Sequence, residues 1–366
     1  MASSTHQGRL ADLLPPSWKT SVTAWLAEDT PSMDYAGFVV GEAPRVATLW
    51  GKSAGVIAGR PFFDEVFTQC GCTVEWHAEE GTELDLSANG GKMRVATVRG
   101  PVRGILLGER VALNTLSRCS GIARSSRDLV GRVRAAGYTG ILAGTRKTTP
   151  GFRLVEKYGM LVGGADAHRM DLSSMIMLKD NHVWSRGSIT DAVKAAKSVG
   201  GFSVKIEVEV QSEAEADEAI EAGADVVMLD NFTGDGVKIA ARSLKERWQG
   251  KRHFLLEVSG GLTPENVKPY VCNGEFESPS KCSHPVNWVG TANCLRRGHY
   301  LDEFNPPGGT SRRLFPQDRA LDVKGNNINT VNNICNLGDS GPNRALCKAM
   351  AVVVQLVLVY LSRHLE

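Results

Sequence analysis

The stretch Gly144-Thr-Arg-Lys-Thr-Thr-Pro-Gly-Phe-Arg153 determines how this sequence of 366 residues is organised. It follows the apolar run 138–143, which predicts a short buried strand, and leads into 150–158, which predicts a helix with proline in its first turn. Arg146 and Lys147 therefore lie just past a strand, beside a helix N-terminus. Cations, hydroxyls and free backbone N–H groups around one point suit carboxylates or phosphates. Alone, the pair would equally be a solvated basic turn.

Length and composition limit the classes of protein to consider. A chain of this length favours two or three domains with a sizeable core, and its net charge of +2 gives no general attraction to nucleic acid or membrane. The first residues contain no apolar segment typical of a secretory signal. None of the eight cysteines forms a C-x-x-C pair, so neither a zinc ribbon nor a disulfide framework is predicted. We expect a reducing, cytoplasmic setting.

The first part of the chain predicts a small α+β domain in which we find no catalytic motif. Amphipathic and alternating patterns predict helices at 17–29 and 61–70, and strands at 45–50, 55–58, 72–77 and 93–99. A helical pattern then covers 104–136, and Gly121 predicts either a break or close packing between two helices. Arg110 lies inside an otherwise apolar segment, where a salt bridge is the simplest interpretation.

Strand-like runs and helical stretches alternate after residue 137. Five predicted strands end in polar residues: Arg146 and Lys147, Lys179, Glu209, Asp230, and Ser259 with Gly260 and Gly261. The helices are expected at 189–199, 213–222 and 236–248, with another from Thr263. Because parallel strands joined by helices point their carboxyl ends the same way, these residues should converge on one rim. Two carboxylates near several cations suit Mg²⁺ beside a polyanionic substrate.

His168 and Arg169 lie in an irregular connection between two of these units. Such a pair would usually be a surface loop. Beside the rim, it becomes a candidate third anchor for an anion.

At this point several segments together resemble one family. They are GERVALNTLSRCSGIA (108–123), AGTRKTTPGFRLVEKYGMLVGG (143–164), AHRMDLSSMIMLKDNH (167–182), KIEVEV (205–210), EAGADVVMLDNF (221–232) and EVSGG (257–261). The sequence over roughly residues 10–270 resembles the quinolinate phosphoribosyltransferases, and is closest to those of animals. The resemblance implies an α/β fold in which an N-terminal α/β sandwich domain (1–116) precedes an open TIM-like α/β barrel (117–270).

The resemblance also implies an activity. Phosphoribosyl would pass from phosphoribosyl pyrophosphate to quinolinate with decarboxylation, giving nicotinate mononucleotide, pyrophosphate and CO₂ in NAD biosynthesis. Lys179, Glu209 and Asp230 would be the catalytic residues, and the two carboxylates would bind Mg²⁺.

The family's pattern also assigns the substrate contacts. Quinolinate would be held by Arg110, Arg146, Lys147, His168 and Arg169, and Lys179 would face both substrates. The ribose and phosphates would lie near Glu209, Asp230, Ser259, Gly260 and Gly261. A homo-oligomer, dimer or hexamer, is implied, in which Arg110 reaches a neighbouring subunit's site.

Residues 271–366 depart from the family pattern. They contain 11 asparagines, against 5 in the first 270 residues, and show no strand–helix alternation. We therefore expect a divergent, largely disordered tail and a barrel that lacks its last strand, which leaves the strand of Glu257 and Ser259 with an open edge.

Two alternatives remain at this stage. One is a catalytically impaired chain that acts only as a subunit of hetero-oligomers. The other is a lyase that uses Lys179 as a Schiff-base amine.

Overall fold

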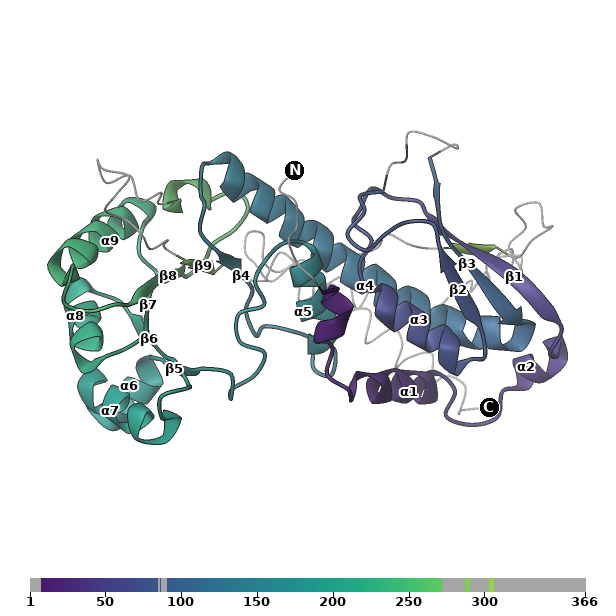
Figure 1. Cartoon of the computed structure of the whole chain (residues 1–366), viewed down its shortest axis with the longest axis horizontal. Helices are drawn as coiled ribbons and strands as arrows, with labels where there is room; N and C mark the ends of the chain where they lie inside the picture. Colours follow the sequence, from purple (N-terminus) through teal and green to yellow (C-terminus); the bar gives the residue numbers. More distant parts are fainter. Residues whose placement is uncertain (1–7, 85, 87–90, 272–286, 290–302, 306–366) are drawn as a thin grey trace, which may run out of the picture. The chain divides into compact units, whose positions relative to one another are not determined.

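The computed structural model describes residues 8–84, 86, 91–271, 287–289 and 303–305, and two β-sheets organise them (Figure 1). One sheet is antiparallel, with strands in the order β10-β1-β3-β2. The other is parallel, in the order β4-β9-β8-β7-β6-β5. The predicted fold class, an α/β domain followed by an open parallel sheet with helices, is confirmed.

The antiparallel sheet belongs to the first part of the chain, where the predictions are confirmed with one exception. Residues 55–58 form no strand; Val56 makes only an isolated bridge to Glu83. Aromatic residues of α3, Phe63 and Phe67, pack into the core of this part. The elements are α1 (Trp18–Asp29), α2 (Tyr35–Val40), β1 (Pro44–Gly51), α3 (Arg60–Gln69), β2 (Thr73–Trp76), β3 (Met93–Pro101) and β10 (Glu303–Asn305), after a short 3₁₀ helix (Leu10–Leu13).

One helix, α4 (Val102–Ala135), follows β3 and runs without interruption for 34 residues. Of the two alternatives predicted for Gly121, the break is therefore wrong. Glycine in a helix costs only about 1 kcal/mol relative to alanine, and Gly121 lies in a run of buried positions whose packing outweighs that cost. The predicted domain boundary at 116/117 falls inside this continuous helix.

The parallel sheet and its helices follow α4. Three helices here begin at a serine or threonine, Ser188, Ser212 and Thr233, whose side-chain oxygen accepts a hydrogen bond from a backbone N–H of the first turn. Helix α8 ends at Gly223, which has the left-handed backbone that favours glycine. The elements are β4 (Leu142–Ala143), α5 (Arg153–Val162), β5 (Ile176–Leu178), α6 (Asp180–Arg186), α7 (Ile189–Gly200), β6 (Ile206–Val210), α8 (Glu213–Ala222), β7 (Val226–Asp230), α9 (Gly234–Trp248), β8 (Leu255–Ser259) and β9 (Asn287–Val289).

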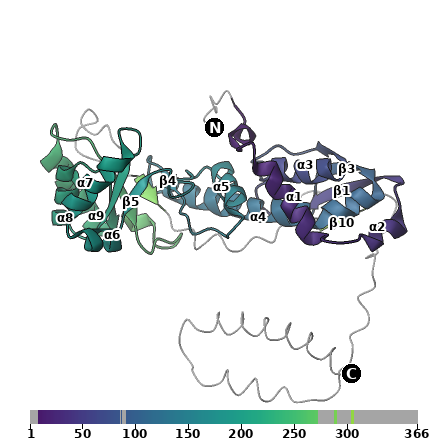
Figure 2. The same cartoon turned by 90° about the horizontal axis from the view of Figure 1, so that it is seen from below.

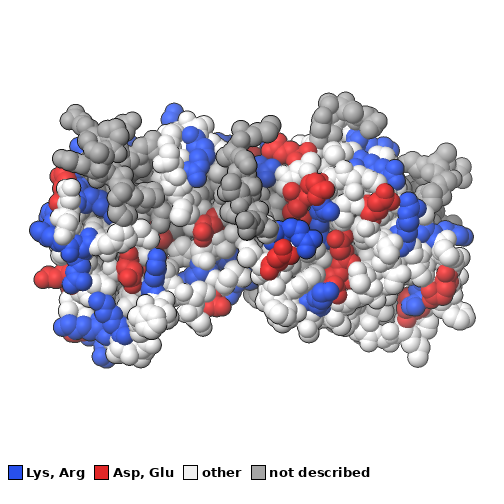
Figure 3. Space-filling view, viewed as in Figure 1, with Lys and Arg blue, Asp and Glu red and all other residues white. Residues whose placement is uncertain are grey.

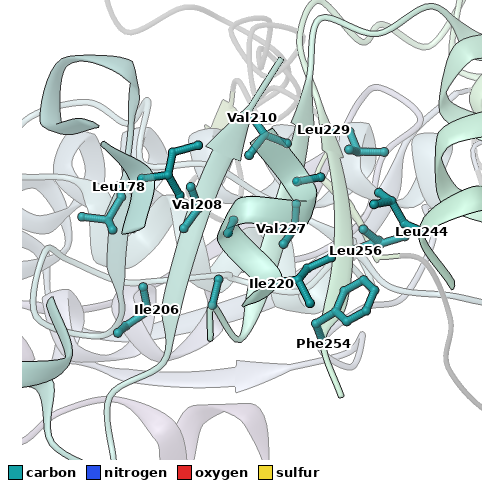
Figure 4. Packing of buried hydrophobic residues seen from close by; sticks show 14 of the residues in the cluster. Leu178, Ile206, Val208, Val210, Ile220, Val227, Leu229, Leu244, Phe254 and Leu256 are labelled. Carbon is teal, nitrogen blue, oxygen red and sulfur yellow. The ribbon is translucent and has the colours of Figure 1, made fainter. Parts of the chain in front are cut away.

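The helices lie along one face of the parallel sheet, as Figure 1 shows for α6–α9, and Figure 2 shows α7, α8 and α9 grouped beside β5. Alternate residues of β6, β7 and β8 enter the core on this face, among them Val208, Val227 and Leu256 (Figure 4). Fully burying such a side chain contributes about 1.5–3 kcal/mol. Since side chains alternate along a strand, the residues between them face the other side of the sheet.

Two predictions about the end of the parallel sheet are wrong. Thr263 does not open a long helix: Thr263 and Asn266 exchange hydrogen bonds in a turn, and only a 3₁₀ helix (Lys268–Tyr270) follows. Pro269 contributes to this result, because it lacks the backbone N–H that a continuing α-helix would use to bond the carbonyl four residues earlier.

The sheet also does not lack a strand at its expected end. β9 pairs in parallel with both β8 and β4, with Trp288 opposite Val258 on one side and Leu142 on the other. Therefore β8 has no open edge here, and the predicted missing strand is an error. A second short strand from the same region, β10, pairs with β1. The predicted disorder of the rest of the tail concerns residues that lie outside the described ranges.

Candidate active site

The predicted rim is present at the carboxyl ends of the parallel strands. Arg146 and Lys147 follow β4, and Lys179 follows β5. Glu209 is the penultimate residue of β6. Asp230 and Ser259 are the last residues of β7 and β8, and they lie opposite each other in register. All these residues lie at or just after the carboxyl end of a strand, where the chain leaves the sheet.

His168 and Arg169 reach the same rim through a backbone contact that the sequence did not predict. Asp166 bridges to Ala143 at the end of β4: its N–H donates to Leu142 O (2.8 Å), and Gly144 N–H donates to its carbonyl (2.8 Å). The connection thus runs beside β4. The predicted third anchor is consistent with this placement.

The first cluster of charges on the rim contains a lysine and two carboxylates. Lys179 donates to Glu209 in an ion pair. The pKa of the neighbouring Asp230 is raised by its burial and by the Glu209 carboxylate, while Lys179 and Lys147 act in the opposite direction. These four side chains therefore interact electrostatically, as the predicted convergence requires.

A glycine turn completes this side of the rim. Gly260 and Gly261 have φ values of 101° and 61°, in the left-handed region that favours glycine. A Cβ atom on Gly260 would lie only 2.6 Å from the backbone nitrogen of Asn231, so the chain can pass here only as glycine. The Asn231 N–H in turn donates to Ser259 O (3.2 Å), which joins the ends of β7 and β8.

The second cluster consists of the cations Arg146, Lys157 and Arg169 and lies on the β4 side of the same sheet. Burial and the neighbouring Arg146 lower the pKa of Arg169, whose guanidinium donates to Met175 O (3.4 Å). The Nε atom of Arg146 is buried and has no hydrogen-bond partner among the described residues. Lys157 of α5 is 1 % exposed, and burial, with the nearby Arg153, lowers its pKa to about 8. Such closely spaced cations favour an anionic ligand.

Two buried glutamates lie below this cluster, on the face of the sheet opposite the helices. His168 Nε2 lies 3.1 Å from Glu257 Oε2 and 3.8 Å from Glu207 Oε2. Both glutamates are buried, at 3 % and 0 % exposure, and burial raises the pKa of each to about 8. Glu207 Oε1 and Oε2 and Glu257 Oε1 have no partner among the described residues, so this pocket holds uncompensated polar atoms.

Within the described residues, Arg110 forms no ion pair with a residue of either cluster. It is exposed on α4, and among the described residues it interacts electrostatically with Glu109. Burial raises the pKa of Glu109, and the charge of Arg110 partly opposes that shift. The expected ion pair is not formed within the described residues.

The sequence interpretation missed Lys157, Glu207 and Glu257 as site residues. A signal was available for the glutamates: each interrupts an apolar strand and lies two residues before a predicted rim residue, Glu209 or Ser259, so it shares that residue's face. No comparable signal distinguishes Lys157 from a surface lysine on an amphipathic helix.

Comparison with known proteins now identifies the family. Family models described as "Quinolinate phosphoribosyl transferase, N-terminal domain" and "C-terminal domain" match residues 32–120 and 122–291. The chain belongs to the quinolinate phosphoribosyltransferase family. The second match extends past residue 270 and includes β9, which agrees with the observed pairing.

Named relatives support the same family. "Nicotinate-nucleotide pyrophosphorylase [carboxylating]" of Homo sapiens is 52% identical over 269 residues, covering 73% of this chain and 88% of that protein. The rat protein of the same name is 51% identical over 266 residues, covering 72% and 86%. Among solved structures, NadC from Streptococcus pyogenes aligns with a TM-score of 0.68 at 33% identity, covering 81% of this chain and 98% of that one.

The surface and the helices add two observations. In Figure 3 Lys and Arg side chains are interspersed with Asp and Glu across the visible face. None of the helices in the described part of the chain is both long and apolar enough to span a bilayer.

Proposed function

We propose that this quinolinate phosphoribosyltransferase transfers phosphoribosyl from phosphoribosyl pyrophosphate to the ring nitrogen of quinolinate and releases pyrophosphate, CO₂ and nicotinate mononucleotide. The supporting observation is the presence, on one rim, of a cationic cluster and a separate cluster of Lys179, Glu209 and Asp230. One cluster suits a small planar diacid, and the other suits a sugar phosphate.

Quinolinate belongs at the cationic cluster. Arg146 and Arg169 are planar donors that can pair with its two carboxylates, and the buried Nε of Arg146 lacks a partner until a ligand supplies one. Lys147 and His168 extend this side. A diacid held at both carboxylates has its nitrogen in a fixed direction, which brings the reacting atoms together.

Phosphoribosyl pyrophosphate belongs at the second cluster. Asp230 and Glu209 would lie near the ribose, while Ser259, Gly260 and Gly261 would present backbone N–H groups to the 5′-phosphate, which glycine lets approach closely. Lys179 would bind anions of both substrates, once these anions replace Glu209 as its partner.

The same carboxylates fit Mg²⁺. They are hard oxygen donors on adjacent strands, and the influence of Glu209 on the pKa of Asp230 shows a repulsion that a cation would relieve. Mg²⁺ usually binds through one or two carboxylates together with substrate phosphates. Bound there by Glu209 and Asp230, it would neutralise charge on the departing pyrophosphate.

The protein groups account for the chemical steps as follows. Loss of pyrophosphate leaves positive charge on the anomeric carbon, which Glu209 and Asp230 stabilise. The ring nitrogen of the oriented quinolinate forms the new bond to that carbon. The C2–CO₂ bond then breaks, and the cations around the ring stabilise the electron pair left on C2 until a proton arrives.

Two further features are part of the proposal. Arg110, exposed on α4, serves the site of a neighbouring copy in a homo-oligomer. A cytoplasmic location agrees with the cysteine usage.

The test is an assay of the purified full-length chain with quinolinate, phosphoribosyl pyrophosphate and Mg²⁺. Equal amounts of nicotinate mononucleotide, pyrophosphate and CO₂ are expected, and none of them when either substrate is omitted. A folded chain that forms no product but joins an active relative in hetero-oligomers would support the non-catalytic alternative. No observation favours the lyase, because Glu209 is a partner for the ammonium form of Lys179, whereas a Schiff base requires the neutral amine.

A further inference from the structure

His168 has a backbone conformation that its surroundings must hold. Its φ is 53°, in the left-handed region that residues other than glycine rarely adopt. The N–H of His168 donates to Asp166 Oδ1 (2.6 Å), and the preceding carbonyl, Ala167 O, accepts from the buried ammonium of Lys157. Strained backbone that is fixed from several sides is typical of sites where a side chain must point in one direction.

The imidazole of His168 is held from one side only. Nε2 lies at hydrogen-bond distance from Glu257 Oε2 (3.1 Å), whereas Glu207 Oε2 at 3.8 Å is too far for a hydrogen bond. The other nitrogen, Nδ1, has no partner among the described residues and is not one of the buried atoms that lack one. Nδ1 is therefore the ring atom left open to a ligand.

Glu257 is well placed to act on this ring. It is 3 % exposed on β8, two residues before the rim residue Ser259 and opposite Met228 of β7. Its backbone is fixed by β7 on one side and β9 on the other. A carboxyl group held this firmly fixes both the orientation of an imidazole and the nitrogen that carries its proton. Burial raises the pKa of Glu257 to about 8 and lowers the pKa of His168, so a protonated Glu257 donates to Nε2 and the proton of the neutral ring lies on Nδ1.

We propose that Glu257 is a positioning residue for quinolinate binding: by donating its carboxyl proton to Nε2 of His168 it keeps the ring proton on Nδ1, and Nδ1–H then donates to a quinolinate carboxylate. This inference rests on the proposed function, because it takes quinolinate as the ligand of the cationic cluster. Glu257 itself does not touch the substrate. Its effect should therefore pass entirely through His168.

A double-mutant cycle tests this dependence. Glu257→Met removes the hydrogen-bond donor with a side chain of similar length, Glu257→Gln keeps a neutral donor in its amide group, and each is combined with His168→Ala. The matched control is Asp64→Asn, which alters another carboxyl group hydrogen-bonded to an aromatic ring nitrogen, Trp76 Nε1 at 2.6 Å, in the antiparallel part of the chain. The measurements are quinolinate affinity by calorimetry, both KM values and kcat.

We expect Glu257→Met to raise the quinolinate Kd and KM about tenfold, with the KM for phosphoribosyl pyrophosphate unchanged, because one charge-assisted contact loses its orientation. Glu257→Gln should have a smaller effect, and Asp64→Asn none. In the His168→Ala background neither change at Glu257 should weaken binding further. An equal loss in both backgrounds, or a loss for both substrates alike, would overturn the proposal and make Glu257 a packing residue.

Calorimetry keeps this test separate from the proposed function. If the unaltered chain binds quinolinate but forms no nicotinate mononucleotide, the proposed activity fails while the cycle is still measured by affinity. If the unaltered chain does not bind quinolinate, the positioning role is rejected as well.

Discussion

Lys179, directly after β5, donates to Glu209 of the adjacent strand β6, so the central cation of the site is paired with a carboxylate before any substrate binds. Substrate anions must therefore compete with Glu209 for this lysine. When they do, Glu209 is released toward the same ligand. Substrate binding and the release of Glu209 are thus coupled through one ion pair.

Lys179→Ala should lower kcat about a hundredfold, comparable to the loss of one preorganised donor in other active sites. The reason is that Glu209 and Asp230 would lose their neighbouring cation. Steady-state kinetics with both substrates measure the effect. Lys238→Ala is the control, since Lys238 pairs with Asp235 on α9 at 4.0 Å and is partly exposed. Equal kinetics for the two variants would remove Lys179 from the mechanism.

Arg146→Ala should weaken quinolinate binding roughly 10- to 150-fold, the equivalent of about 1.5–3 kcal/mol for a hydrogen bond to a charged group. Its buried Nε has no partner among the described residues, so a ligand carboxylate would be its first. Calorimetric titration with quinolinate measures the change. Arg124→Ala, which removes an exposed ion pair with Asp128 on α4, serves as the control. Unaltered affinity in the Arg146 variant would mean that quinolinate binds elsewhere.

Much of the parallel sheet could be predicted because its signals are local. Strands 206–210, 226–230 and 255–259 are largely apolar, with a polar residue at or next to their carboxyl ends, and the first two precede helices that begin at Ser212 and Thr233. The direction of parallel strands then places Glu209, Asp230 and Ser259 on one rim without further information.

The remaining features depend on contacts between distant parts of the chain. β9 comprises three residues in a region without periodicity, and only its pairing with β4 and β8 defines it as a strand. The bridge of Asp166 to Ala143, which brings His168 to the rim, is likewise non-local. Strand alternation places Glu207 and Glu257 on the face of the rim residues, but their burial depends on the neighbouring strands and on His168, which are distant in the sequence.

Glu80→Gln should make stability less dependent on pH. The Glu80 carboxyl accepts from the N–H groups of Gly59 (2.7 Å) and Arg60 (3.2 Å) at the start of α3. Burial nevertheless raises its pKa from 4.5 to about 7. A folded-state pKa above the unfolded value gives stability that is full below about pH 4.5 and is lost as pH rises through about 7, at most on the order of 3 kcal/mol.

Thermal unfolding between pH 4.5 and 7.5 checks this prediction about Glu80. The Tm of the parent chain should contain a component that falls over this interval, and Glu80→Gln should remove it. Glu79→Gln is a suitable control because Glu79 is adjacent but exposed, in an ion pair with Arg60. Identical pH profiles for the parent and the Glu80 variant would refute the assignment.

Arg110 is expected to act across a subunit boundary. Arg110→Ala and Lys179→Ala chains should each have strongly reduced activity, and a mixture should be more active than either alone, because one hybrid site would contain both intact residues. The two variant chains are unfolded and refolded together so that their subunits mix. Pull-down of a tagged chain must then show that mixed oligomers have formed. If mixed oligomers form and activity does not return, Arg110 serves its own subunit or only packs.

Trp288→Pro should destabilise the parallel sheet, although only one residue of a three-residue strand is changed. Trp288 lies opposite Leu142 on one side and Val258 on the other, so its backbone belongs to a central strand, where a missing N–H and the fixed φ of proline break pairing. The ends of β4 and β8, which carry Arg146 and Ser259, would then lose their common neighbour. We expect a lower Tm and greater aggregation through the opened edges.

A chain ending at Val271 should behave in the same way, whereas one ending at Asn305, which retains β9 and β10, should match the full-length chain in Tm and solubility. Light scattering and calorimetry measure these differences. If the chain ending at Val271 is as stable and soluble as the one ending at Asn305, β9 does not complete the sheet.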